Sequence, residues 1–399
     1  MILYSNLTWF KKISRKIVEF TKIQKTFRPP KKAKILVFDG TVNYLLEPLF
    51  NGEPYEVLFT RGERLNLSPI ILYKFLLYLI REKARKYAYF LAYIEQVSPV
   101  IIITYIDNNH LFQQADSKNR DKGRKFIAIA NGTRNLSAQS IQLKMAGLSK
   151  GNIFHSNLFC HGQCCVDEYV KHGTQVENFY PIGSLQDSYF RALSRRKLKK
   201  PTFDICLVVT PFYDIPYEST WHLNGRQSCE LSLSYLRVFS ERNDVKISAT
   251  SKIPAGTEGS ESELKWLQRF LGNCFTYFPQ KNDVPTSSYI VSDDAEVVIG
   301  QASTLLRECF GRGKKVLQVN YSEEPFHDFP FEGIWLLKKS GYPDFEKRLL
   351  DLLSMDQDHY KKQCKHYPGY VIGYDESKPT HIAISEFIQQ HILQQSTVA

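Results

Sequence analysis

The stretch VVIGQASTLLRECFGRGKKVLQVN, from Val297 to Asn320, decides the fold class. It reads as an apolar strand, a turn of small polar residues, a helix, a glycine stop and a second apolar strand, a pattern that indicates a parallel β-sheet covered by helices. Ser303 and Thr304 stand at the start of the helix, and Glu308 lies one turn further along the same face. Free N–H groups and a partial positive charge at a helix N-terminus favour phosphate. Two interpretations are open: Ser303 is a helix cap and Glu308 a solvated residue, or the turn after Gly300 binds a phosphorylated ligand.

The same alternation of strands and helices extends over most of the 399 residues. A length of this size suits two domains. Apolar runs predict strands in 33–40, 55–60, 99–107, 125–132 and 152–160, and a short apolar piece at 178–184 closes the first half. Further strands are predicted in 203–210, 244–251, 274–279, 295–300 and 314–320. The segment 191–201 holds six basic residues and no acid, so we place a linker there. The sequence therefore predicts an α/β domain at 33–190 and a second at 202–399.

The positive charge of the chain is concentrated at its start. Residues 1–34 hold ten basic residues and one acid, a net charge of +9 out of +11 for the whole chain, which leaves +2 for the remainder. The nearly neutral body argues against a nucleic-acid-binding surface. Apolar residues at helical spacing between Phe10 and Phe27 predict a basic amphipathic helix in the arm 1–32, which suits an anionic membrane surface through residues 8–28. A solubilising tail, or a helix packed on the body, remains the alternative.

Two further features bear on location. The eight cysteines show no disulfide spacing and no secretory signal precedes them, so we expect a reducing compartment. No stretch reaches the apolar length of a membrane-spanning helix. We expect a cytoplasmic protein held at the inner face of the membrane.

Open α/β sheets bind ligands beyond the carboxyl ends of their strands, so the residues that follow each strand are candidates. Asp107 and Asn108 follow the most apolar strand, where an acid can serve as a general base or simply cap the next helix. His161 follows the strand at 152–160 as a second candidate for proton transfer. Further candidates for the cleft are Asn131, Gly132, Arg134, Gly183 and Ser184, and Arg226 is a candidate phosphate partner or a plain surface residue.

Metal-binding patterns are weak. Cys160, His161, Cys164 and Cys165 lack a second ligand pair at zinc spacing. Asp356 and Asp358 form a D-Q-D sequence, which we interpret as capping and solvation between two helices. We expect no metal site.

Several of these stretches resemble a known group of proteins. DAEVVIGQASTLLRECFGRGKKVLQVNY and FEGIWLLKKSGYPDFEKRLLDLLSMDQDHY resemble the C-terminal domain of bacterial GT-B transferases that build surface carbohydrate, such as capsule and lipopolysaccharide glycosyltransferases and CDP-glycerol glycerophosphotransferases. IIITYIDNNHLF, KFIAIANGTRN and YPIGSLQDSYF resemble the acceptor-side half of the same broad group. The similarity covers about residues 33–365.

The resemblance implies a GT-B-like fold, in which two Rossmann-like domains face each other across a cleft. The nucleotide of a nucleotide-sugar donor then lies on the second domain, at Gly300, Ser303, Thr304 and Glu308, and the carbohydrate or lipid-linked acceptor lies on the first. Asp107, or else His161, would deprotonate the acceptor. Retaining members often carry a second glutamate eight positions before the first, where this chain has Gly300, so inversion without metal or cofactor is favoured.

Two other functions stay open at this point. A nucleotide-sugar 2-epimerase would keep the fold but need several acids and histidines in the cleft. A GT-B-like carbohydrate-binding or assembly subunit would keep the fold without catalysis.

Overall fold

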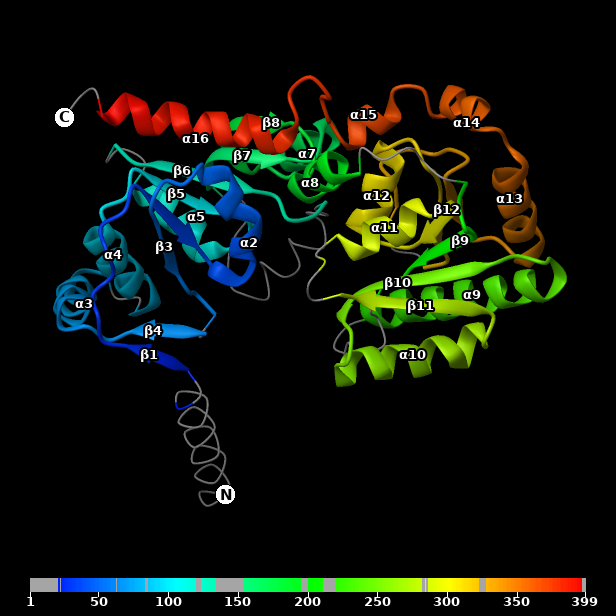
Figure 1. The fold of residues 1–399 in the computed structure, drawn as a ribbon, viewed down its shortest axis with the longest axis horizontal. Helices are drawn as coiled ribbons and strands as arrows, with labels where there is room; N and C mark the ends of the chain where they lie inside the picture. The colour runs from blue at the N-terminus through cyan, green and yellow to red at the C-terminus, as the bar shows by residue number, and fades with distance from the viewer. Residues whose placement is uncertain are drawn as a thin grey trace, which may run out of the picture.

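The computed structural model describes residues 21, 23–61, 63–82, 85–119, 123–133, 154–194, 200–210, 220–281, 284, 286–322 and 328–396. These residues form two α/β halves that lie side by side (Figure 1). Each half is built around a six-stranded sheet in which every strand pair is parallel. The expected architecture of two parallel α/β domains is confirmed.

The N-terminal sheet has the order β3-β2-β5-β6-β7-β8. Its strands are β2 (Ile35–Phe38), β3 (Tyr55–Leu58), β5 (Ile101–Thr104), β6 (Lys125–Ile129), β7 (Phe154–Cys160) and β8 (Gln175–Pro181). The central strands are buried along their whole length, as continuous apolar and β-branched runs require when helices cover both faces.

The C-terminal sheet has the order β11-β10-β9-β12-β13-β14. Its strands are β9 (Phe203–Val208), β10 (Ile247–Pro254), β11 (Phe275–Gln280), β12 (Ala295–Gly300), β13 (Lys315–Asn320) and β14 (Leu336–Lys338). The strand order reverses between β9 and β12, which are neighbours in the sheet. Such a switch point is where open α/β sheets form a ligand crevice.

Helices cover both sheets. Those that follow strands of the N-terminal half are α2 (Asn43–Leu46), α3 (Pro69–Arg81), α4 (Arg85–Val97), α5 (His110–Asn119), α7 (Gln163–Lys171) and α8 (Leu185–Leu193), with short 3-10 turns η1 (Gly40–Val42) and η2 (Glu47–Phe50). The later ones are α9 (Thr220–Arg242), α10 (Glu258–Leu271), α11 (Ser287–Asp293), α12 (Thr304–Gly311), α13 (Tyr342–Ser354), α14 (Gln357–Cys364), α15 (Tyr367–Val371) and α16 (Thr380–Ser396). None of the helices in the described part of the chain has the length and apolar content that crossing a bilayer requires.

The last helix, α16, packs on the N-terminal half and not on the half that precedes it in sequence (Figure 1). Ile384, Ile388 and Ile392 belong to the same buried cluster as Ile35 and Ile103 of the N-terminal sheet. This differs from the sequence interpretation, which assigns the whole of 202–399 to the second domain. The reason is that α16 buries its isoleucines only against this sheet, a contact that local periodicity does not specify.

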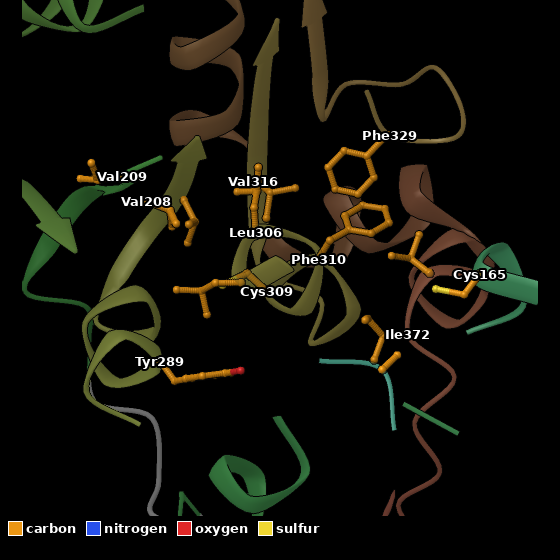
Figure 2. Close-up of a cluster of buried hydrophobic side chains, with 14 of the residues drawn as sticks. Cys165, Val208, Val209, Tyr289, Leu306, Cys309, Phe310, Val316, Phe329 and Ile372 are labelled. Atoms are coloured by element: carbon orange, nitrogen blue, oxygen red, sulfur yellow. The ribbon is translucent and has the colours of Figure 1, made fainter. Parts of the chain in front are cut away.

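A continuous apolar core also joins the two halves. Figure 2 shows Phe310 of α12, Ile372 after α15 and Cys165 of α7 in one cluster of buried side chains. Gly311 ends α12 against Ile372, and a Cβ atom at this position would overlap that side chain. A Cβ atom on Gly162 of the N-terminal half would likewise overlap the backbone oxygens of Tyr370 and Val371 in α15, so the two halves are in close contact here.

Most of the basic arm lies outside the described residues, which do not include 1–20 and 22. Where the arm is described, Gln24–Thr26 form β1, which pairs in parallel with β4 (Arg64–Asn66). The prediction of a helix through the arm is therefore wrong at residues 24–26, because their backbone is engaged in strand pairing. The linker predicted at 191–201 likewise starts too early, since α8 continues to Leu193.

Candidate functional site

A cavity of about 310 Å³ lies at the carboxyl ends of β9, β10 and β12, between the two halves. The C-terminal half supplies most of its walls, and Asn131 and Gln186 come from the N-terminal half. A larger hollow of about 420 Å³ opens at the outer edge of the N-terminal half, beside β1 and β3. The smaller cavity is the candidate site because it occupies the switch point of the C-terminal sheet.

The turn before α12 forms one wall, with Ser303, Thr304 and Glu308 lining the cavity. The side chain of Ser303 makes no capping hydrogen bond, so the interpretation of Ser303 as only a cap is wrong. The Thr304 hydroxyl accepts a hydrogen bond from the backbone N–H of Thr133 at 3.1 Å. A Cβ atom on Gly132 would lie 3.0 Å from that hydroxyl oxygen, so a glycine allows the loop after β6 to approach α12 this closely.

Glu308 of α12 is a buried acid that lines the cavity. It is only 2% exposed and accepts a hydrogen bond from the hydroxyl of Tyr289 at 2.8 Å. Burial raises the pKa of Glu308, and the negative charge of Asp187 raises it further, while His161, Ser184 and Tyr289 oppose the rise. The alternative of a solvated helix residue is therefore wrong, and Glu308 is a buried acid with a raised pKa at the cavity, a combination found at functional sites.

His161 lies close to Glu308 from the opposite half. Burial lowers the pKa of His161, but a hydrogen bond with Cys165 and the charges of Cys165, Glu308 and Asp107 outweigh burial and raise it. Its Nδ1 atom is buried and has no hydrogen-bond partner within the part of the chain that the structure describes. His161 does not line the cavity, but its charge acts on Glu308.

Asp107 is fully buried and accepts a hydrogen bond from the hydroxyl of Tyr169 at 2.7 Å. It does not line the cavity, which differs from its expected place at the cleft edge. It does not cap the next helix either, because Asn109 accepts hydrogen bonds from the N–H groups of Leu111 and Phe112 at the start of α5. The chain turns Asp107 inward towards α7, a direction that the sequence alone does not give.

The other candidates fall into two groups. Asn131 lines the cavity and Gly132 touches Thr304. Ser184 begins α8 by accepting from the N–H of Asp187 at 3.3 Å, and its hydroxyl also hydrogen-bonds Glu308. Gly300 ends β12, where a Cβ atom would come within 3.1 Å of a backbone oxygen of the neighbouring strand.

The second group lies away from the cavity. Arg226 pairs with Glu230 at 2.8 Å on α9, and neither it nor Asn108 is among the lining residues. Gly183 has a φ of +102° and packs against Thr380, so it serves the junction with α16. Arg134 lies outside the described residues.

An ion-pair cluster missed at the sequence level joins the halves beside Glu308. Arg312, at the end of α12, pairs with Asp187 of α8 in the other half and with Asp293 at 3.0 Å in its own. Arg191 pairs with the same Asp187 at 2.8 Å. Arg312 and Asp187 are both buried, so the negative charge that raises the pKa of Glu308 is itself held by two guanidinium groups.

Two other residues that line the cavity were not predicted from the sequence. Lys252 is the basic side chain among the described lining residues, and it follows Thr250 and Ser251 at the exposed end of β10. The position of Lys252 could have indicated it, because residues just after a strand of a parallel sheet are candidates for ligand binding. The sequence did not indicate Tyr289, because its helix α11 is short and was not predicted.

The metal-binding patterns have structural explanations. Asp356 accepts a hydrogen bond from the N–H of His359 at 2.8 Å, which confirms that the D-Q-D sequence caps α14. Cys160, Cys164 and Cys165 are buried free thiols around His161. Within the described ranges, no group of three or more potential ligands is placed to hold a metal ion.

Comparisons with known proteins agree with this architecture. A family model described as "putative O-antigen biosynthesis protein" matches residues 127–343, which is more than half of the chain. No curated protein matches the chain in sequence.

Solved structures of similar fold span nearly the whole chain. Sucrose-phosphate synthase from Thermosynechococcus elongatus has a TM-score of 0.50 at 12% identity and covers 94% of this chain and 100% of its own. S. aureus MnaA, solved with UDP, has a TM-score of 0.53 at 12% identity and covers 92% and 98%. The UDP-GlcNAc 2-epimerase from Neisseria meningitidis, bound to UDP-GlcNAc, has a TM-score of 0.50 at 12% identity and covers 90% and 99%. At such identities the similarity shows the fold, which is that of GT-B glycosyltransferases and epimerases.

Proposed function

The chain belongs to the O-antigen biosynthesis family whose model it matches, and on this basis we propose that it is a glycosyltransferase that moves a sugar from a nucleotide-activated donor to a surface-polysaccharide or lipid-linked acceptor. The observation that carries the proposal is the cavity at the switch point of the C-terminal sheet, lined by the start of α12 on one side and by residues of the N-terminal half on the other. A transferase needs a donor and an acceptor to meet between two surfaces, and this cavity has both.

The donor nucleotide is proposed to lie against α12. The N-terminal N–H groups of the helix, the hydroxyls of Ser303 and Thr304 and the ammonium group of Lys252 offer donors and positive charge to a diphosphate. The same electrostatic environment stabilises the charge that develops on the departing nucleotide.

The proton chemistry is proposed to pass through Glu308. An inverting transfer requires a base for the acceptor hydroxyl, and Glu308 is the carboxylic acid among the described lining residues. His161 does not line the cavity, so it is proposed as a positioning residue whose charge modulates Glu308. Asp107 supports the same region through Tyr169 without reaching the cavity.

The location is proposed from the charge of the chain. The +9 of residues 1–34 suits the anionic inner face of a membrane, and lipid-linked acceptors reside there. A peripheral cytoplasmic enzyme would then meet a soluble donor and a membrane-bound acceptor in one place.

A thermal-shift panel of UDP, CDP, CMP, GDP and dTDP tests the donor site. A cognate nucleotide at about 100 times its Kd stabilises the protein by about 2.7 kcal/mol, and UDP is the first probe because MnaA was solved with it. Ser303→Ala with Thr304→Val should reduce the shift, and Thr257→Val, at the N-cap of α10, is the matched control. No response to any of the five nucleotides would overturn the donor-site assignment.

A 2-epimerase remains the second candidate, because acids and a histidine do gather at the junction: Glu308, Asp187, Asp107 and His161 are all buried there. Incubation with UDP-GlcNAc in D₂O without acceptor separates the two reactions. Deuterium at C2 of the sugar would establish epimerisation and exclude simple transfer.

A further inference from the structure

Helix α3 carries a row of large apolar side chains that no other described part of the chain covers. Leu72, Tyr73, Leu76, Leu77 and Ile80 are between 40% and 86% exposed, and Ile80 is the most exposed of them. Their spacing at successive helical turns places them on one face. We call these five residues the α3 stripe.

The exposure of the stripe does not result from poor packing of α3. The other face of α3 packs firmly on α4, with Ile71 fully buried and the ring of Phe75 against that of Tyr89. Lys74 pairs with Glu95 at 2.8 Å, and the hydroxyl of Tyr78 donates to the same carboxylate. The helix is therefore held to the protein by buried apolar contacts and an ion pair, while a second apolar face points towards solvent.

Positive charge brackets the stripe at both ends. Residues 69–86 hold five basic residues and one acid, and Arg81, Arg85 and Lys86 are exposed beyond its C-terminal end. At the other end, Arg28, Lys31 and Arg64 border the open hollow of about 420 Å³ that lies beside Asn66, three positions before the first residue of α3.

Strand pairing brings the basic arm to the same edge. Gln24–Thr26 pair with Arg64–Asn66, and the side-chain amide of Asn66 donates to the backbone oxygen of Arg28 at 2.8 Å. The segment with a net charge of +9 therefore joins the body next to the start of α3. Figure 1 shows α3 at the end of the N-terminal half that lies farthest from the C-terminal half, so contact there leaves the cavity between the halves open.

We propose that the α3 stripe is a membrane-docking surface that inserts into the interface of an anionic lipid bilayer while the flanking basic residues contact lipid headgroups. Apolar side chains contribute area-dependent binding and basic residues contribute attraction to anionic lipid, the two components of interfacial helices. A second copy of the chain is the poorer occupant, because this edge would bring two strongly basic surfaces together. The surface does not depend on sugar transfer, so its test is separate from that of the donor site.

The experiment is co-sedimentation of the full-length chain with vesicles of mixed phosphatidylglycerol and phosphatidylcholine. The triple variant Leu76→Ser, Leu77→Ser, Ile80→Ser should lower the partition coefficient by roughly tenfold or more, since it removes inserted apolar area. The matched control is Val170→Ser, Leu193→Ser, Leu393→Ser, three exposed apolar residues of other helices. The control should bind as the unmodified chain does, and circular dichroism should show both variants folded.

A second measurement does not depend on loss of binding. In Ile80→Trp, lipids brominated on their acyl chains should quench emission beyond that lost from the native tryptophans. Unchanged partitioning of the triple variant together with no additional quenching would overturn the proposal. Loss of a dimer in the triple variant, with vesicle binding intact, would also overturn it and assign the stripe to a second copy.

Discussion

The hydroxyl of Thr304 accepts a hydrogen bond from the backbone N–H of Thr133, so the start of the helix proposed to bind the donor already touches the opposite half. This single bond spans 171 positions of sequence. It makes the loop after β6 part of the cavity wall and couples the donor side to the acceptor side.

Thr304→Val should lower the free energy of unfolding by about 1 kcal/mol, because the N–H of Thr133 loses its acceptor. Thr304→Ser keeps the oxygen and should stay close to the unmodified chain. Chemical denaturation followed by fluorescence measures both. Equal stability of the two variants would show that the bond does not join the halves in solution.

Glu308 and Glu263 form a matched pair of buried acids. Each accepts a hydrogen bond from a tyrosine hydroxyl, and burial raises the pKa of each, but only Glu308 lines the cavity. Glu308→Gln should abolish most turnover, whereas Glu263→Gln should retain it. Loss of turnover in both would assign the effect to structure and not to the site.

The pH dependence of stability follows from the same two residues. A carboxyl group whose pKa is higher in the folded chain holds its proton more tightly there, so its contribution to stability falls as the pH rises from the unfolded value of about 4.5 through the raised folded value. Glutamine does not ionise. Both variants should therefore gain melting temperature relative to the unmodified chain as the pH is raised through that window. A melting temperature of the variant minus that of the unmodified chain that decreases with rising pH would contradict the raised pKa.

The ion pair between Arg312 and Asp187 should be costly to break. Asp187→Asn leaves a buried guanidinium group with less compensation, and we expect a loss of roughly 3 kcal/mol in the free energy of unfolding. The exposed pair of Lys378 and Glu386, at 2.7 Å, is the control, because Glu386→Gln should cost less than about 1 kcal/mol. Similar costs for the two substitutions would show that the junction between the halves is solvated.

Asp107 and Tyr169 share one hydrogen bond, so Asp107→Asn and Tyr169→Phe should have similar effects. Both should keep the nucleotide-induced thermal shift and lower turnover by less than the factor of about 10² to 10⁴ that loss of a general base costs. Steady-state kinetics measures the pair. A much larger loss in Asp107→Asn than in Tyr169→Phe would restore Asp107 as the base.

Strands and their order along the chain could be predicted from sequence because parallel strands buried on both faces are continuous apolar runs, as in Ile101–Thr104. Short elements escaped prediction, since β14 and β1 have three residues each and carry no periodic pattern. The cavity wall formed by Ser303, Thr304 and Glu308 was predictable from its position after a strand.

The junction between the halves was not predictable in the same way. Arg312 and Asp187 are separated by 125 positions, and neither has a local pattern that names its partner. The inward direction of Asp107 depends on Tyr169, 62 positions later. Such contacts are fixed by how two halves pack, and a single sequence carries no record of that packing.

The return of α16 to the N-terminal sheet has a consequence for biosynthesis. The ribosome completes the strands of the N-terminal half early, but Ile384, Ile388 and Ile392, which belong to its core, are synthesised only after all strands of the C-terminal sheet. The N-terminal half is therefore the first to be synthesised but the last to complete its core. Part of its apolar surface stays uncovered while the second half is translated. Nascent chains stalled before residue 380 should be held by chaperones, and release should follow only when α16 emerges.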